Sequence, residues 1–182
     1  MLELNFAPFP EMETERLLLR NLTEDDVQDV FEFRGDPEIM QYIPRPIAQN
    51  PEDAKMVIEM MTGFTANNEK INWGVVEKAT GKLLGSFGFV RFNYESYRAE
   101  VGYILNKNYH GKGYAKEALA PILDYGFNEM GLHSIEAVIR AENTPSMKLI
   151  EKFGFTKDAY FKDYINHNGA FYDAVVYSLV KK

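Results

Sequence analysis

The most informative stretch of the chain reads Val101-Gly-Tyr-Ile-Leu105, then His110-Gly-Lys-Gly-Tyr-Ala115 and then Lys116-Glu-Ala-Leu119. Its residues predict a buried strand, a short glycine-rich loop and the first turn of a helix. That arrangement presents free backbone N–H groups and the positive end of a helix dipole, which suit a phosphate or a pyrophosphate. Gly111 and Gly113 would let the backbone approach the anion, and Lys112 could add a positive charge.

Two common phosphate-binding motifs do not match this loop. The Walker motif needs Gly-Lys followed by Ser or Thr, but Gly113 follows Lys112. The dinucleotide motif needs Gly or Ala where Lys116 stands, and this loop lies late in the chain. Taken alone, a glycine-rich turn before a helix is a plain turn as often as it is a ligand-binding loop, so the assignment needs support from other segments.

The segments around this loop alternate between helical and strand periodicity. The expected elements are a strand over 16–22, helices starting at Thr23 and Pro51, strands over 71–77, 83–92 and 99–105, a helix over 114–130, a strand over 134–139, a helix over 143–153, and a closing hairpin of 155–165 and 171–180. Pro121 predicts a kink in the long helix or an earlier end. Three consecutive strands followed by strand–helix alternation predict a mixed sheet in an α/β fold.

Length and composition limit the classes of protein. The 182 residues suit one domain over residues 1–182. A formal charge of -7 argues against nucleic-acid binding and weakly favours a cationic partner such as an amine. The chain has no cysteine, which excludes disulfides, thiolate zinc sites and a cysteine nucleophile. His133 and His167 lack the spacing of metal ligands, so we expect no metal site.

The chain carries no recognisable targeting or membrane segment. Residues 1–6 show no basic region and no cleavage site of a signal peptide. No stretch approaches the roughly 20 apolar residues that span a bilayer. We therefore expect a soluble, cytoplasmic protein that does not contact membranes.

Several of these segments resemble the GNAT N-acetyltransferases. The resemblance is carried by residues 99–105, 110–115 and 116–119, by Asn143-Thr-Pro-Ser146 and by Lys152-Phe-Gly-Phe155, and it extends from Glu13–Arg20 to Val175–Leu179. It is closest to the branch that acetylates the N-termini of ribosomal proteins. It implies a GNAT fold, with a mixed, mostly antiparallel central sheet, helices on both faces, and a V-shaped opening after the strand at 99–105.

The resemblance assigns the loop to the pyrophosphate of acetyl-CoA. The family pattern is Gln/Arg-x-x-Gly-x-Gly/Ala, and here it becomes His110-x-x-Gly113-x-Ala115. Histidine departs from the pattern at the first position, although an imidazole can still donate one hydrogen bond. The residues implied to cradle the pyrophosphate are His110, Gly111, Lys112, Gly113, Tyr114 and Ala115.

The resemblance also assigns five further positions. Ile104 and Leu105 would pair through their backbone with the amides of pantetheine, and Asn143 would bind the same arm. Ser146 would lie near the thioester sulfur and protonate the departing thiolate. Glu100 would be the general base, although an acid beside an arginine on a strand is as often simply ion-paired. Asn143 is also a natural helix cap, and Ser146 is common near helix starts.

The implied reaction is transfer of an acetyl group from acetyl-CoA to a primary amine, without a covalent enzyme intermediate. The acceptor could be a protein N-terminus, or a small polyamine or drug amine. A third alternative is a non-catalytic module that binds acyl-CoA. The sequence does not identify the acceptor, the acyl-chain preference or the oligomeric state.

Overall fold

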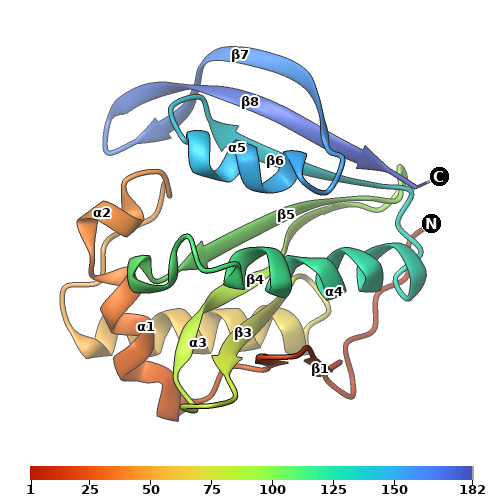
Figure 1. The fold of residues 1–182 in the computed structure, drawn as a ribbon. Helices are drawn as coiled ribbons and strands as arrows, with labels where there is room; N and C mark the ends of the chain where they lie inside the picture. Colours follow the sequence, from red (N-terminus) through yellow and green to blue (C-terminus); the bar gives the residue numbers. More distant parts are fainter. Residues whose placement is uncertain (182) are drawn as a thin grey trace.

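One eight-stranded sheet runs through the molecule in the order β1-β2-β3-β4-β5-β6-β8-β7 (Figure 1). The computed structural model describes residues 1–181. The strands are β1 (Met12–Glu13), β2 (Leu17–Arg20), β3 (Ile71–Glu77), β4 (Leu83–Asn93), β5 (Arg98–Leu105), β6 (Ser134–Arg140), β7 (Thr156–His167) and β8 (Ala170–Val180). The helices are α1 (Val27–Arg34), α2 (Pro37–Met40), α3 (Pro51–Ala66), α4 (Tyr114–Asn128) and α5 (Thr144–Glu151), with short 3₁₀ turns η1 (Glu24–Asp26) and η2 (Lys107–Tyr109).

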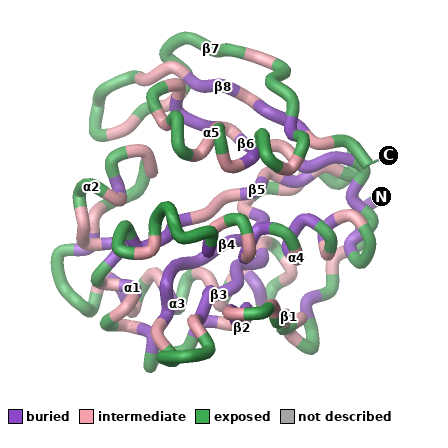
Figure 2. Tube along the Cα trace, in the orientation of Figure 1, coloured by how far each residue is buried: buried purple, intermediate pink, exposed green. Residues whose placement is uncertain are grey.

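The helices cover both faces of this sheet, as expected. α4 and α5 lie on the near face in Figure 1, and α3 lies behind the strands. The side chains between α4 and the sheet form one apolar core around Trp73, Phe87 and Phe89. A second core lies under α1 and α3, around Phe33 and Ile104. Figure 2 shows the central strands buried along most of their length, because both faces are covered.

The sheet splits at its one parallel pair of strands. All other neighbouring strands are antiparallel, whereas β5 and β6 run parallel and pair only over Arg98–Glu100 with Ser134–Glu136. Beyond Glu100 the two strands diverge, which leaves the backbone of residues 101–105 without a partner on the β6 side. The V-shaped opening therefore begins within the expected strand, not after it.

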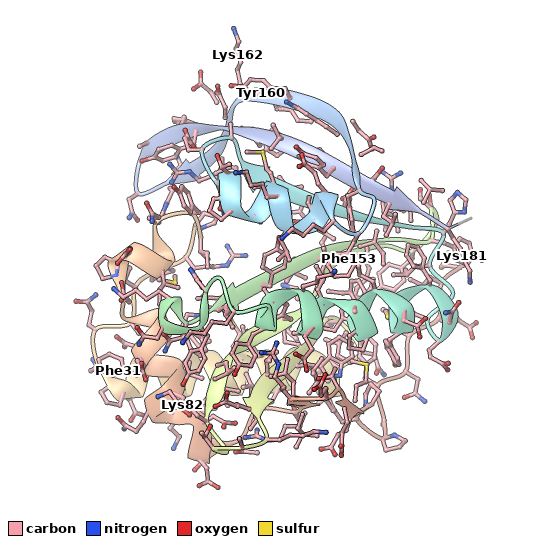
Figure 3. All side chains as sticks on the ribbon, in the orientation of Figure 1. Phe31, Lys82, Phe153, Tyr160, Lys162 and Lys181 are labelled. Carbon is pink, nitrogen blue, oxygen red and sulfur yellow. The ribbon has the colours of Figure 1, made fainter. Side chains whose placement is uncertain are left out.

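The far edge of the sheet is formed by the hairpin of β7 and β8. β7 is an exposed edge strand, and Tyr160 and Lys162 project from it away from the sheet (Figure 3). The pairing register shifts between Phe161 and Ile165, which marks a bulge. At the end of this bulge, Tyr164 and Ile165 line the cavity described below.

Most expected elements are confirmed, and the differences are local. β1 was not expected, because two residues are too short to show a strand period. The first helix opens with the 3₁₀ turn η1, in which Thr23 and Asp26 form a capping box. α4 contains Pro121 and ends at Asn128, two residues earlier than expected. Among residues 1–181, no helix is long and apolar enough to cross a bilayer.

Candidate active site

A cavity of about 1180 Å³ occupies the opening between β5 and β6. Its walls come from α3 and the segment that precedes it, from the strands β3 to β6, from α5 and from β7. Of the residues singled out in the sequence, it brings together Glu100, Ile104, Asn143 and Ser146. The loop at 110–115 and Leu105 do not line this cavity. They lie further along β5 and at the start of α4.

Glu100 stands at the point where β5 and β6 part. Its side chain is 14% exposed, and its Oε2 lies 3.3 Å from Nη1 of Arg91. That contact lacks hydrogen-bond geometry, so Oε2 is buried without a donor. A buried carboxylate oxygen that no group satisfies is available to accept a proton from a ligand.

The surroundings of Glu100 make it a better base than a free carboxylate. Burial raises the pKa of Glu100, and the neighbouring Glu136 raises the pKa further, against the opposing effect of Arg91 and Arg45. Glu136 is the residue paired with Glu100 in the parallel ladder, so the two carboxylates share one face of the sheet. A carboxylate with a raised pKa accepts a proton more readily than a free one, as general-base catalysis requires.

Ser146 is held from the opposite side of the opening by Tyr103. The Ser146 Oγ and the Tyr103 hydroxyl oxygen lie 2.6 Å apart. The Tyr103 ring stacks on Phe87 at 5.3 Å between centroids, and burial raises the pKa of Tyr103 to about 12. Tyr103 therefore keeps its proton at neutral pH and can donate it to Ser146. The sequence reasoning did not assign Tyr103 to the site.

Asn143 caps α5 with its side chain. Its Oδ1 accepts a hydrogen bond from the backbone N–H of Ser146 at 3.2 Å. Pro145 occupies the first turn, where a missing N–H costs nothing. This is the capping role that the sequence also predicted. It uses only the carbonyl end of the amide, and the NH₂ end stays free for a ligand.

The backbone of β5 offers Leu105, and not Ile104, to the opening. The N–H of Asn106 bonds to the Leu84 carbonyl, so the Leu105 carbonyl in the same peptide unit points the other way, toward β6. Ile104 pairs with Ser86 on β4. Its carbonyl oxygen would lie 2.1 Å from a Cβ placed on Gly85 of β4. The expectation for Ile104 is thus corrected, because backbone groups alternate along a strand.

His110 is directed back to this strand. Its Nε2 lies 2.9 Å from the Leu105 carbonyl oxygen, and because a carbonyl only accepts, the imidazole is the donor. The ring therefore ties the loop to the end of β5. The hydrogen bond that an imidazole can donate here goes to the protein backbone.

The start of α4 has the features of an anion site. Gly111 and Gly113 adopt positive φ angles of 73° and 84°, which side chains rarely tolerate. Gly113 is the N-cap and provides no capping side chain, whereas α2, α3 and α5 are capped by side-chain oxygens. The first N–H groups of α4 are therefore available for an external acceptor.

Arg16, which precedes β2, and Glu77, at the end of β3, fix this loop through their side chains. Arg16 donates to the Lys112 carbonyl at 3.2 Å and pairs with Glu117 at 2.6 Å. Its guanidinium lies 4.1 Å from the centre of the Tyr114 ring. The Tyr114 hydroxyl donates to Glu77, which lowers the pKa of that carboxyl. The side chain of Tyr114 is buried by these contacts and stiffens the loop, whereas its backbone N–H belongs to the uncapped first turn of α4.

Other polar side chains of the cavity were missed by sequence reasoning. Asn72 and Ser86 are buried within β3 and β4, and Arg34 is buried at the end of α1. An amide inside the apolar run 71–76 was the one available signal, whereas nothing near Arg34 marked it as buried. Among residues 1–181, no group of three or more His, Cys, Asp or Glu side chains could hold a metal ion.

Comparison with known sequences matches residues 16–156 to the family described as acetyltransferase (GNAT) domain. An uncharacterized N-acetyltransferase, p20, from Bacillus licheniformis is 34% identical over 93% of this chain and 95% of its own length. A spermidine N(1)-acetyltransferase from Vibrio cholerae is 26% identical over 87% of this chain and 89% of its own.

Solved structures with this fold include a GNAT-family acetyltransferase from Bacillus anthracis. It has a TM-score of 0.84 and 33% identity, and the match covers 94% of this chain and 98% of that one. A ribosomal L7/L12 α-N-protein acetyltransferase in complex with coenzyme A has a TM-score of 0.83, with coverage of 94% and 98%. At 16% identity, that second likeness concerns the fold alone.

Proposed function

Because the chain belongs to the GNAT family of acetyltransferases, we propose that it transfers the acetyl group of acetyl-CoA to a primary amine in the opening between β5 and β6. The observation that carries the proposal is Oε2 of Glu100, a buried carboxylate oxygen without a hydrogen-bond donor, at the apex of that opening. The acceptor we favour is the N-terminal amine of a peptide or protein, as in the ribosomal branch that the sequence resembles.

The residues at the start of α4 fit the pyrophosphate of coenzyme A. The N–H groups of the first turn and the two glycines of positive φ leave room and donors for an anion. Lys112 is exposed beside them and adds a positive charge. The backbone of β5 at Leu105, whose carbonyl already accepts from His110, and the NH₂ group of Asn143 would hold the pantetheine arm.

The proposed chemistry uses residues on both faces of the sheet. Glu100 takes a proton from the ammonium group of the acceptor, which must be neutral to attack a thioester. The backbone of the central strand stabilises the oxyanion that forms on the thioester carbonyl. Ser146 donates a proton toward the departing thiolate, and Tyr103 orients Ser146. Much of the acceleration comes from holding amine and thioester together.

Ser146 and Tyr103 should act as one unit. We expect Ser146→Ala and Tyr103→Phe each to lower kcat by roughly tenfold, and the double variant to lower it no further, because residues acting as a unit are not additive. Steady-state kinetics of the three variants tests this. Tyr125→Phe is the control, since Tyr125 packs on Trp73 in the α4 core and lies outside the cavity. Losses that multiply in the double variant would contradict the proposed pair.

The proposed function is tested by measuring CoA release with a panel of amines. We expect acetyl-CoA to bind in preference to ATP and NAD, and short peptides to be better acceptors than spermidine. Calorimetry in which ATP or NAD binds as tightly as acetyl-CoA would contradict the cofactor assignment. Rates that strongly favour spermidine would support the polyamine alternative, which the relative from V. cholerae suggests. Tight binding without turnover on any amine would indicate a binding module.

A further inference from the structure

Arg34, the last residue of α1, is buried in the cavity without a partner. It is 8% exposed and lines the cavity wall. Its Nε has no hydrogen-bond partner, and no carboxylate among residues 1–181 raises its pKa. Burial and repulsion from Arg45 lower the pKa of Arg34 to about 10, so the group remains a cation at neutral pH. An unpaired buried cation is costly unless something else pairs with it.

Two other arginines, Arg140, which is buried, and Arg20, which is partly exposed, show how this fold normally satisfies such a group. Arg140 is 9% exposed and donates to the Gln41 carbonyl at 2.6 Å, with Glu142 at 3.3 Å and the Tyr172 ring 3.4 Å away. Arg20 makes a two-pronged contact with Asp26, with both distances at 2.8 Å. Arg34 differs from both, because no carboxylate or carbonyl group of residues 1–181 pairs with its guanidinium.

The cavity as a whole is cationic, although the chain is acidic. Its lining holds five cationic side chains against two acidic ones, whereas the whole chain carries -7. The cationic ones are Arg34, Arg45, Lys70, Arg91 and Arg140, and the acidic ones are Asp53 and Glu100. Asp53 is occupied by the backbone N–H of Gln49 at 2.7 Å. The guanidinium of Arg45 donates to the Pro44 carbonyl at 3.2 Å and forms no ion pair with a carboxylate of residues 1–181. The cavity therefore has a cationic corner at Arg34 and Arg45.

We infer that this corner binds an anionic group, a carboxylate or a phosphate, carried by the acceptor amine. The inference rests on the proposed acetyl transfer and deepens it by naming the class of acceptor. A guanidinium fork matches both kinds of oxyanion. α1 lies on the face of the sheet that carries Glu100, and α4 covers the opposite face. The anion thus belongs to the acceptor and not to the pyrophosphate, and a polyamine is disfavoured by repulsion.

Matched peptides test this directly. The probes are two C-terminally amidated peptides with serine first and either aspartate or asparagine second, so that they differ only in one carboxylate. We expect the wild type to prefer the aspartyl peptide by roughly ten- to a hundredfold in kcat/KM. Arg34→Met should bring that ratio close to one while the affinity for CoA stays unchanged. The melting temperature of the free protein should not fall, because the variant removes an unpaired buried charge.

Control variants and a second arm complete the experiment. Lys55→Met removes a partly exposed cation from α3, at a position that does not line the cavity, and should keep the preference for the aspartyl peptide. Arg45→Ala, at an exposed position, should weaken the preference for the aspartyl peptide. This variant keeps the test decisive if Arg34→Met folds poorly. β-Alanine against its amide, and phosphoethanolamine against ethanolamine, distinguish a small acidic amine from a peptide as the source of the anion.

Binding is measured separately from turnover. The acetylated aspartyl and asparaginyl peptides, titrated into the CoA complex by calorimetry, should differ in affinity in the wild type and not in Arg34→Met. Equal affinities and equal rates for every acidic and neutral pair would overturn the inference while leaving acetyl transfer intact. Discrimination in binding without acetylation of any amine would instead leave the anion site standing and contradict the proposed function.

Discussion

Glu100→Gln is expected to lower kcat/KM by roughly ten- to a thousandfold while the affinity for CoA stays at the wild-type value, consistent with loss of a general base. Glutamine keeps the shape of the side chain but cannot accept the proton. The side chain lies at the apex of the opening, on the face opposite α4, so its loss should not disturb the loop at 110–115. Steady-state rates with a peptide acceptor, together with calorimetry of CoA binding, provide the measurement.

The pH dependence of this variant separates a base from a structural acid. The pKa of Glu100 is raised in the folded protein. Its carboxylate therefore becomes available as a base at a higher pH than a free carboxyl group does. Wild-type kcat/KM should therefore fall on the acid side as Glu100 protonates. The deficit of Glu100→Gln should shrink as pH rises, because more of the amine is then neutral without help. Wild-type rates for this variant across pH 6 to 9 would show that Glu100 is only structural.

The stability of Glu100→Gln gives an independent check on the raised pKa of Glu100, because the substitution should not destabilise the protein although it lowers activity. A carboxyl whose pKa is raised on folding binds protons more readily in the native state, so its ionised form opposes folding at neutral pH. Glu100→Gln should then leave the melting temperature unchanged or raise it.

Glu136→Gln is the matched control on the neighbouring strand. It removes the negative charge that raises the pKa of Glu100, so the acid limb of the rate should move to lower pH, with little change at neutral pH.

The sequence predicted those parts of the molecule that depend on local pattern. β3 has the predicted bounds 71–77, because an apolar run between turn residues needs no tertiary information. The loop at 110–115 was found because glycines with positive φ at a helix start leave a sequence signature. The GNAT family and its mixed sheet followed from the resemblance of these segments. The branch within the family, and with it the acceptor, stays a prediction.

The parts that could not be predicted depend on contacts between distant segments. The pairing of β5 with β6 brings together residues 36 positions apart and lasts only three pairs, which no local period encodes. Tyr103 reaches Ser146 across 43 positions. Arg34 has the spacing of an ordinary helical residue, and only the fold shows that it is buried and unpaired. Ile104 was misassigned because the direction of its carbonyl depends on which neighbour β5 pairs with.

Gly113→Val is expected to weaken CoA binding by roughly a hundredfold or more, which corresponds to the loss of one to two charge-assisted hydrogen bonds. Valine at φ 84° is strained, and relief of that strain would turn the first N–H groups of α4 away from the anion. A Cβ at this position also lies 3.4 Å from Nη2 of Arg16, so the branched side chain would displace the guanidinium that fixes the loop. Lys112→Ala should have a milder effect, because backbone donors carry most of the contact.

Gly81→Val separates lost binding from lost stability. Gly81 has a φ of 73° and open space around its Cβ position, in the turn between β3 and β4, away from the loop. Both variants should therefore lose a similar stability, about 1–3 kcal/mol for a strained backbone position. Only Gly113→Val should lose affinity for CoA, because only Gly113 lies in the loop that we propose to bind the pyrophosphate. Melting curves and calorimetry on both proteins decide the matter: equal CoA affinities would mean that the loop at 110–115 does not bind the pyrophosphate.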